Sequence, residues 1–292
     1  MKRLNCIPAL LLSVILPLIW LSSCASTPAA GSGKPVILVV SFGTSYRETR
    51  EKTIEAVEKA MTAAYPDYEI RRAFTSQTII NILSRRDGIK IDNVDEAMKR
   101  LVKDKVTDLI VQPTHVMNGF EYDDMMAEIK PYEKRFASIR YGLPLMISNQ
   151  DFSEVTSALI ENTRQFHADD TAVVFMGHGT EHDANVVYHR LDGLLKTQGN
   201  ERYFIGTVEA EPSIEDIIPE LHSLGVKKVV LMPFMIVAGD HANNDMAGDD
   251  EDSWKSILEG DGFTATAVLR GLGEYPEIQK IFVRHAGEAI GL

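Results

Sequence analysis

Cysteine is almost absent from this sequence of 292 residues, and its two cysteines, Cys6 and Cys24, both lie near the N-terminus. That placement excludes disulfides, thiolate metal sites and cysteine nucleophiles from the body of the chain. Any metal ligands there must therefore be histidine and carboxylate side chains.

Basic residues are also scarce. Lys and Arg number 30 against 42 Asp and Glu, which gives a formal net charge of -12. A chain this acidic is poorly suited to bind a phosphate backbone, so nucleic acid is not expected as a partner. An acidic surface usually serves solubility, and it also favours the capture of cations.

The motifs of nucleotide-dependent enzymes and serine hydrolases are missing too. The first apolar run is followed by Ser41-Phe42-Gly43-Thr44-Ser45, which lacks the Lys and the glycine spacing of a phosphate loop. No Gly-x-Gly-x-x-Gly follows this run, and no Gly-x-Ser-x-Gly elbow occurs in the chain. A nucleotide cofactor is therefore not expected.

Long apolar runs are confined to the N-terminus. Lys2 and Arg3 precede an apolar segment, residues 7–20, which leads to Leu21-Ser22-Ser23-Cys24. The segment is interrupted by proline and is shorter than the roughly 20 apolar residues of a membrane span. The pattern predicts a signal peptide over residues 1–23 with Cys24 as the lipid attachment point. The alternative is a cleaved signal peptide with Cys24 merely nearby.

Residues 24–35 are rich in Ser, Thr, Pro, Ala and Gly. Such a composition predicts a flexible tether between the lipid and the folded part of the protein. We therefore expect an exported protein that is lipid-anchored to the cell envelope, in the periplasm or at the outer membrane, with the membrane as a partner through Cys24.

From Val36 onward, short apolar runs alternate with longer amphipathic stretches. Strands are predicted over residues 36–40, 69–74, 108–112, 139–143, 172–176, 203–208, 228–232 and 264–269. Helices are predicted over residues 47–64, 78–83, 94–103, 122–136, 151–166, 185–195, 213–224 and 246–258. The alternation predicts an α/β protein of two Rossmann-like domains, residues 36–150 and 151–292, each a four-stranded parallel sheet flanked by helices.

The two predicted domains read as two copies of one unit. Residues 36–44 align with residues 172–180, which places Phe42 in the position of His178. Residues 109–121 align with residues 229–241, and the matched pairs are Pro113 with Pro233, Gly119 with Gly239 and Glu121 with His241. A proline and a glycine matched at one spacing favour duplication over shared hydrophobicity alone.

Three candidate metal ligands follow the first three strands of the second copy: His178, Glu209 and His241. The carboxyl ends of parallel strands meet at one edge of a sheet, so these side chains are expected to lie close together. Gly177, Gly179 and Gly239 remove side chains that would crowd a ligand. Two imidazoles and a carboxylate suit Co²⁺, Fe²⁺ or Ni²⁺ and leave coordination positions open.

Each of these residues also has a purely structural interpretation. His178 could hydrogen-bond a turn, His241 could begin a helix, and Glu209 could be a solvated acid. Glu121, at a strand end of the first copy, either faces the same cleft or is a helix-start carboxylate. His115 either lines the cleft or is a packed, hydrogen-bonded histidine.

These motifs resemble the anaerobic sirohydrochlorin cobaltochelatase (CbiK-type) family, which is related to class II ferrochelatases. The resemblance runs from residue 36 to the C-terminus and rests on residues 41–45, 115–119, 177–182, 207–209 and 237–242. It implies a tetrapyrrole in a cleft between the two domains, with His178, Glu209 and His241 binding the divalent metal substrate. It also implies catalytic roles for His178, as ligand and base, and for Glu121 on the opposite wall. The residues that would contact the tetrapyrrole are Ser41, Phe42, Gly43, Thr44, His115 and Gly179.

The function implied is insertion of cobalt, or alternatively iron or nickel, into sirohydrochlorin during cobalamin or related tetrapyrrole biosynthesis. The lipid anchor departs from the family pattern, because members that build cobalamin are typically cytoplasmic. It raises a second hypothesis, an exported lipoprotein that binds haem or removes its iron. A third is a metal carrier that never binds a tetrapyrrole. The oligomeric state stays open, a homo-oligomer included.

Overall fold

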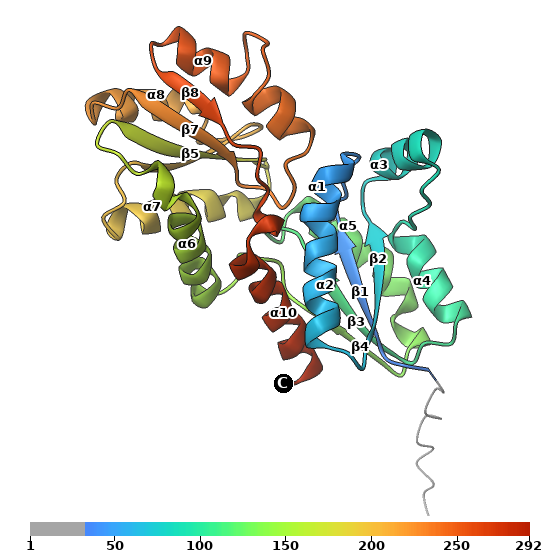
Figure 1. Ribbon diagram of the computed structural model, residues 1–292. Helices are drawn as coiled ribbons and strands as arrows, with labels where there is room; N and C mark the ends of the chain where they lie inside the picture. The colour runs from blue at the N-terminus through green and yellow to red at the C-terminus, as the bar shows by residue number, and fades with distance from the viewer. Residues whose placement is uncertain (1–32) are drawn as a thin grey trace, which may run out of the picture. The chain divides into compact units, whose positions relative to one another are not determined.

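The computed structural model describes residues 33–292, which fall in one compact unit (Figure 1). The predicted signal peptide, the lipid attachment at Cys24 and the tether up to residue 32 lie outside these residues. The division into domains after residue 150 stays a prediction. Across residues 33–292, no helix has both the length and the apolar character needed to cross a membrane.

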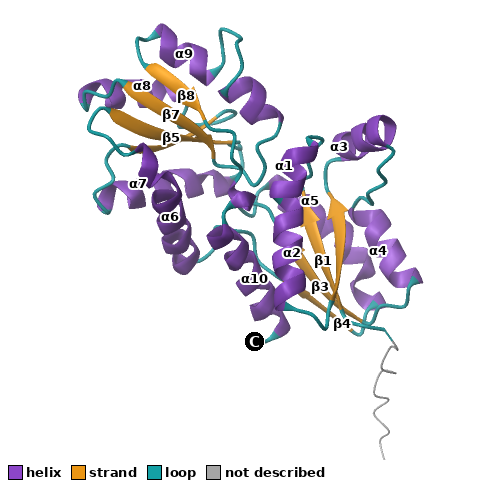
Figure 2. Cartoon of the chain, in the orientation of Figure 1, coloured by secondary structure: helices purple, strands orange, loops and turns teal. Residues whose placement is uncertain are grey.

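Two parallel four-stranded sheets form the framework (Figure 2). The first contains β1 (Val36–Ser41), β2 (Glu69–Phe74), β3 (Asp108–Pro113) and β4 (Ser138–Tyr141), in the order β2-β1-β3-β4. The second contains β5 (Thr171–Gly177), β6 (Tyr203–Thr207), β7 (Lys228–Pro233) and β8 (Thr264–Ala267), in the order β6-β5-β7-β8. The predicted fold class of two four-stranded parallel sheets is confirmed.

Helices connect the strands. They are α1 (Arg47–Lys52), α2 (Ile54–Ala64), α3 (Gln77–Ile82), α4 (Val94–Lys103), α5 (Phe120–Ile129), α6 (Asn149–Thr163), α7 (Val186–Thr197), α8 (Ile214–Ser223), α9 (Trp254–Gly260) and α10 (Pro276–Ile290). Short 3₁₀ or π segments are η1 (Leu83–Asp87), η2 (Lys130–Arg135), η3 (Arg164–Phe166), η4 (Asp183–Asn185), η5 (Ala242–Met246) and η6 (Leu272–Glu274).

The two sheets share one hydrogen-bonding register, which supports the internal duplication. Val40 in β1 pairs with Pro113 in β3, and Met176 in β5 pairs with Pro233 in β7. The residue after each proline donates its N–H to the neighbouring strand, to Val40 at 2.8 Å and to Met176 at 2.7 Å. A slip of one residue would exchange the two faces of a strand. The shared register therefore places equivalent positions of both copies at the same edge of their sheets.

Alternate residues along each strand supply cores on opposite faces of the sheet. In the first sheet, Ile37 and Val39 pack with residues of α2, whereas Leu38 and Val40 pack with residues of α4 and α5. In the second sheet, one face packs on α7 and the other on α8 and α9. Burial of each such aliphatic side chain contributes about 1.5–3 kcal/mol, so both sheets are firm supports for the loops at their edges.

The C-terminal helix α10 has no counterpart among the helices predicted from the sequence. It follows the second sheet in the chain but packs against α2, α6 and strands β3 and β4 of the first half (Figure 1). The Tyr65 hydroxyl donates to the carbonyl of Val283 at 2.6 Å, and Arg140 donates to that of Ile290 at 2.8 Å. Apolar residues of α10 and α6 form one core with residues of both sheets, so the two halves are joined by a shared core.

Three predicted helices differ from the structure. The helix predicted over residues 122–136 ends as an α-helix at Ile129, and residues 130–135 form the 3₁₀ segment η2. The helix predicted over residues 47–64 is divided at Thr53, where φ is -113° and ψ is -79°, although the N–H of Thr53 still donates to the carbonyl of Thr49 at 3.0 Å. The helix predicted over residues 246–258 is wrong for residues 247–253, where the chain turns. Helix α9 begins only after Ser253, whose hydroxyl caps it by accepting from the N–H of Ser256 at 3.2 Å.

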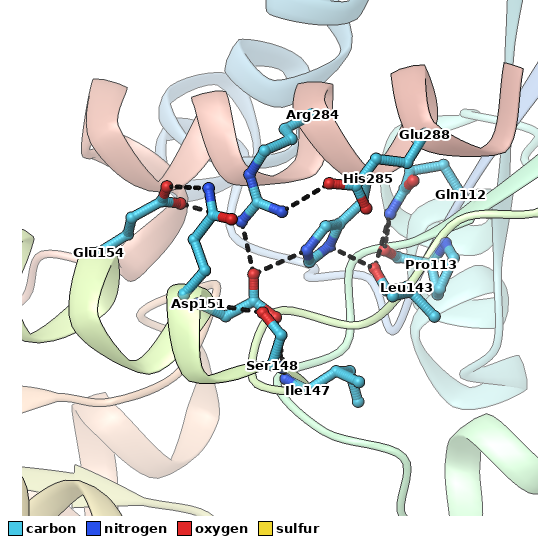
Figure 3. A network of polar contacts seen from close by, with 11 residues as sticks. Gln112, Pro113, Leu143, Ile147, Ser148, Asp151, Glu154, Arg284, His285 and Glu288 are labelled. Carbon is cyan, nitrogen blue, oxygen red and sulfur yellow. Dashed lines mark hydrogen bonds and ion pairs between the residues drawn. The ribbon is translucent and has the colours of Figure 1, made fainter. Parts of the chain in front are cut away.

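A buried ionic network ties the segment between the sheets to α10 (Figure 3). The carboxylate of Asp151, in the first turn of α6, accepts from the N–H of Ser148 at 2.7 Å, from Arg284 at 2.5 Å and from Nε2 of His285 at 2.9 Å. Nδ1 of His285 lies 3.0 Å from the carbonyl oxygen of Leu143. Asp151 is fully buried, so this network holds the connecting segment at one place on α10.

Candidate active site

The loops at the carboxyl ends of both sheets line one cleft of about 860 Å³. Ligand sites usually measure roughly 300–1,000 Å³, so the cleft is large enough for a sizeable organic molecule. Its described lining is mostly apolar and hydroxyl-bearing and includes four acids, Glu121, Glu181, Glu209 and Asp240, but no Lys or Arg. A concave surface with acidic groups and without bases favours entry of a divalent cation.

His178, Glu209 and His241 converge at one place in this cleft. One ligand atom of each lies within 4.8 Å of those of the other two. Nδ1 of His178 is 3.6 Å from Glu209 Oε2, and Nε2 of His241 is 4.0 Å from Glu209 Oε1. Ligand atoms bound at about 2.1 Å to one ion lie about 3–4 Å apart, so the spacing fits a bound divalent metal. The structure thus brings the three predicted ligands together, and their role as ligands stays a prediction.

Backbone hydrogen bonds fix the two loops that hold His178 and Glu209. The N–H of Glu209 donates to the carbonyl of His178 at 2.9 Å, which continues the pairing of β5 with β6. Gly179 has a φ of +84°, and a Cβ there would lie 2.8 Å from the backbone nitrogen of Ala210. A Cβ on Gly177 would lie 2.2 Å from the ring of Tyr188. The sequence predicts that these glycines clear space for a ligand, but their missing side chains make room for the protein's own packing.

Asp245 orients His241 and was missed in the sequence. Its Oδ2 lies 2.8 Å from Nδ1 of His241, so an Nδ1–H donated to the carboxylate leaves the electron pair of Nε2 available to a metal. Nδ1 of His178 lies 2.9 Å from the carbonyl oxygen of Gly179 and 3.6 Å from Glu209 Oε2, so the same nitrogen faces both the loop backbone and the other candidate ligands. The spacing of four residues between His241 and Asp245 is the signal that could have found this carboxylate.

Tyr188 is a second residue that the sequence did not single out. Its hydroxyl accepts the N–H of Gly179 at 3.3 Å, and its ring fills the space beside Gly177. Burial raises the pKa of Tyr188 to about 12, so the hydroxyl stays neutral. Tyr188 therefore supports the loop that positions His178.

The opposite wall has different residues at the three equivalent positions. Phe42, Ser76 and Glu121 stand where the second copy has His178, Glu209 and His241, and all three line the cleft. The N–H of Ser76 donates to the carbonyl of Phe42 at 3.2 Å, in the same way that Glu209 bonds His178. Aligning the second strands of the two copies would have identified Ser76. This wall offers a half-exposed aromatic ring and one carboxylate in place of a ligand set.

Glu121 and His115 lie side by side on that wall. Partial desolvation in the cleft raises the pKa of Glu121, although 52% of its side chain is exposed; the charge of His178 lowers this pKa, and those of Asp124 and Glu209 raise it. His115 is packed as expected, with only 8% of its surface exposed, and it lines the cleft. The interpretation of His115 as a hydrogen-bonded histidine is wrong for its side chain, because neither ring nitrogen has a hydrogen-bond partner among residues 33–292.

The remaining predicted contacts belong to Ser41, the last residue of β1, and to the loop that follows it. Ser41 is buried and accepts a hydrogen bond from Thr114 at 2.8 Å, while the Thr44 hydroxyl accepts from the N–H of Tyr46 at 3.2 Å. Gly43 has a φ of +103°, and a Cβ there would lie 2.6 Å from the ring of Phe74. These residues line the cleft and shape the loop, and Phe42 is the one that exposes its side chain. Their contact with a tetrapyrrole stays a prediction.

Contacts between the two halves bridge the cleft at two places. The hydroxyl of Tyr46 donates to Asp240 at 3.4 Å. Nε2 of His182 lies 3.5 Å from Asp123 Oδ2, and its ring packs edge to face on Phe120 with centroids 4.9 Å apart. Both walls are therefore held in register by polar contacts as well as by the shared core.

Comparisons with known proteins agree with this geometry. A family model described as cobalt chelatase (CbiK) matches residues 35–291. A sirohydrochlorin cobaltochelatase from Salmonella typhimurium is 41% identical and covers 89% of this chain and 97% of its own length. Sirohydrochlorin cobaltochelatase CbiKC from Nitratidesulfovibrio vulgaris is 35% identical and covers 88% of this chain and 91% of its own length.

A solved structure shares the fold at lower sequence similarity. SirB from Bacillus subtilis superposes with a TM-score of 0.62 at 15% identity and covers 88% of this chain and 96% of its own. The match of the family model over nearly the whole described chain, together with relatives above 30% identity, establishes the relationship. The chain belongs to the cobalt chelatase (CbiK) family.

Proposed function

We propose that this protein inserts Co²⁺ into sirohydrochlorin, a step in the synthesis of cobalamin. The observation that supports it most directly is the convergence of two imidazoles and a carboxylate on one wall of a tetrapyrrole-sized cleft. The two curated relatives described above are both named as sirohydrochlorin cobaltochelatases. No nucleotide takes part in the proposed reaction.

Metal insertion exchanges one divalent cation for two protons on the pyrrole nitrogens, so the site must both deliver a metal and accept protons. His178, Glu209 and His241 hold the cation on one wall and leave coordination positions open to the macrocycle nitrogens. As the metal passes to the macrocycle, the electron pair on the ligating nitrogen of His178 is freed and can accept one proton. Glu121, on the opposite wall, accepts the other.

The identity of the metal follows only partly from these residues. A site of two imidazoles and one carboxylate binds several divalent first-row metals. Its affinities follow the general order for these ions, so the ligands alone do not select cobalt. We therefore propose Co²⁺ as the main substrate and expect Fe²⁺ and Ni²⁺ to be accepted in vitro as alternatives.

Turnover by the soluble protein beginning at Ala25 tests the proposal. Under anaerobic conditions, addition of Co²⁺ to sirohydrochlorin and catalytic protein is expected to give a time-dependent absorbance change at a rate proportional to protein concentration. Lack of conversion, together with stable retention of haem on titration, would favour the haem-binding lipoprotein. Tight metal binding without affinity for either macrocycle would favour the metal carrier.

We also propose that the protein is exported and held in the cell envelope by a lipid on Cys24. The proposal rests on the basic start, the apolar segment and the small residues before Cys24. The full-length protein is expected in the membrane fraction, and Cys24→Ser is expected to prevent lipid attachment. Labelling with a palmitate analogue reads this out directly, and equal labelling of both proteins would rule the anchor out.

A further inference from the structure

His115 lines the cleft, but the proposed mechanism gives it no role. It follows β3 on the wall that carries Glu121, and 92% of its surface is covered. Both of its ring nitrogens are buried and have no hydrogen-bond partner within the described chain. A buried polar atom without a partner costs about 1–3 kcal/mol, so a packed histidine with two of them calls for a functional explanation.

Glu121 lies close to His115 in the cleft. Nε2 of His115 lies 3.9 Å from Glu121 Oε2, which is beyond a hydrogen bond, and both residues line the cleft. Hydrogen bonds used in catalysis are often long before substrate binds, and a shift of about 1 Å would bring the two atoms within bonding range. The side chain of Glu121 is 52% exposed, so it has the freedom to make this movement.

His115 is a neutral imidazole in this environment. Burial lowers its pKa to about 4, so one ring nitrogen keeps an electron pair at neutral pH. A neutral imidazole can accept a hydrogen bond from a protonated carboxyl, and it offers a carboxylate no positive charge. Contact with His115 therefore stabilises the protonated form of Glu121 relative to the ionised form.

Building on the proposed function, we infer that His115 is a positioning residue that receives the hydrogen bond of Glu121 once that carboxylate has taken a proton from the macrocycle. The pyrrole N–H bond breaks, its electron pair goes to the metal, and the proton bonds to a Glu121 oxygen. The new O–H then donates to Nε2 of His115. Glu121 is thereby held away from the metal while the product leaves.

Several other groups face Glu121 and contribute to its titration. His178 and Glu209 approach it from the opposite wall, and Asp124 lies on its own helix. Tyr188 on α7 is also close enough for the Glu121 charge to raise the pKa of its hydroxyl, after the larger effect of burial. All of these groups are retained in a His115 variant. A change in the pKa of Glu121 in such a variant therefore reports on His115 itself.

The test compares His115→Phe, which removes the acceptor and keeps a ring, with His115→Gln, which places an acceptor near the position of Nε2. For His115→Phe, kcat/KM is expected to fall about tenfold, less than the roughly 10²–10⁴-fold contribution of a proton acceptor itself. The acidic limb of its pH profile is expected to move to lower pH, because the protonated form of Glu121 loses its partner. His115→Gln is expected to restore most of both properties.

A double variant and a binding measurement separate this role from packing. In a Glu121→Gln background, His115→Phe is expected to have no further effect on turnover. An equal tenfold loss there, or a weaker affinity for Co²⁺, would overturn the inference, because His115 would then act on packing or on the metal.

A readout without turnover keeps the test independent of the proposed reaction. A ¹³C NMR titration follows the glutamate carboxyls, with the Glu121 signal identified by its loss in Glu121→Gln. Its pKa is expected to fall in His115→Phe and to recover in His115→Gln. An unchanged pKa would contradict the inference even if the wild-type protein converts sirohydrochlorin. Failure of the wild-type protein to convert it would contradict the proposed function instead.

Discussion

His241→Ala and His178→Ala are each expected to reduce the kcat/KM of cobalt insertion by more than about 100-fold. Each change removes one of three ligands whose atoms lie within 4.8 Å of one another, and the remaining two cannot enclose the cation. The loss of a partner that only orients a ligand costs roughly 10–100-fold, so loss of the ligand itself should exceed that range. Anaerobic turnover and calorimetric Co²⁺ binding measure the effect.

Two matched variants make this result specific. Asp245→Asn removes the carboxylate that holds Nδ1 of His241 at 2.8 Å but leaves all three ligands, so an intermediate loss of about 10–100-fold is expected. His189→Ala removes an exposed histidine of α7 that does not line the cleft, and it is expected to leave turnover unchanged. Wild-type activity in His241→Ala would mean that the metal binds elsewhere.

Asp151→Asn is expected to lower the free energy of unfolding by about 1–3 kcal/mol, the cost of leaving buried hydrogen-bonding groups without a proper partner. The fully buried carboxylate faces Arg284 and His285, and although Arg284 keeps its ion pairs with Glu154 and Glu288, His285 loses its charged acceptor. The amide would also place its own donor against groups that already donate. Urea unfolding of the soluble wild-type and variant proteins measures the change. The free energies are compared with the same dependence on urea concentration for both proteins.

Glu154→Gln is the matched control for this network. Glu154 also pairs with Arg284, at 2.9 Å, but 39% of its side chain is exposed. An exposed ion pair contributes about 0–1 kcal/mol, so this variant should unfold near the wild-type urea concentration. If both variants lose the same small amount of unfolding free energy, the ionic contacts of Asp151 contribute little, and the stability of this region comes from packing.

The pH dependence of this effect has a definite sign. Burial opposes ionisation of Asp151, yet the N–H of Ser148 and the side chains of Arg284 and His285 together lower its pKa from 3.8 to about 2. A lowered pKa means that the stabilisation is fully present above the ordinary value of 3.8 and disappears as the pH falls toward 2. The stability difference between the wild-type protein and Asp151→Asn should therefore shrink between these two values.

The secondary structure was largely predictable because it depends on local patterns. The apolar runs and their spacing gave all eight strands, and the matched Pro113 and Pro233 showed that two of them are equivalent. Errors arose at Thr53, where the backbone departs from helical dihedral angles, and before Ser253, where an acidic run was taken as a helix. Local dihedral angles and caps decide such positions, and a periodic apolar pattern does not contain them.

The candidate site was predictable only to the level of its main residues. The parallel-sheet rule placed His178, Glu209 and His241 at one edge, because their strands were recognised. Asp245 and Tyr188 were missed, since each acts on a residue of the site and not on the substrate. The role of the glycines beside His178 also differed, because only the fold shows which atoms lie against their missing side chains.

The sequence by itself determined the fold class, the duplication and the family, because strand periodicity, matched prolines and ligand motifs are all local features of the chain. The tertiary structure decided which wall of the cleft each side chain occupies and how α10 joins the two halves through a shared core. It also decided that His115 is buried 3.9 Å from Glu121 and has no side-chain hydrogen bond to any residue from 33 to 292. Burial and proximity between distant segments depend on how the sheets and helices pack, and no local pattern specifies them.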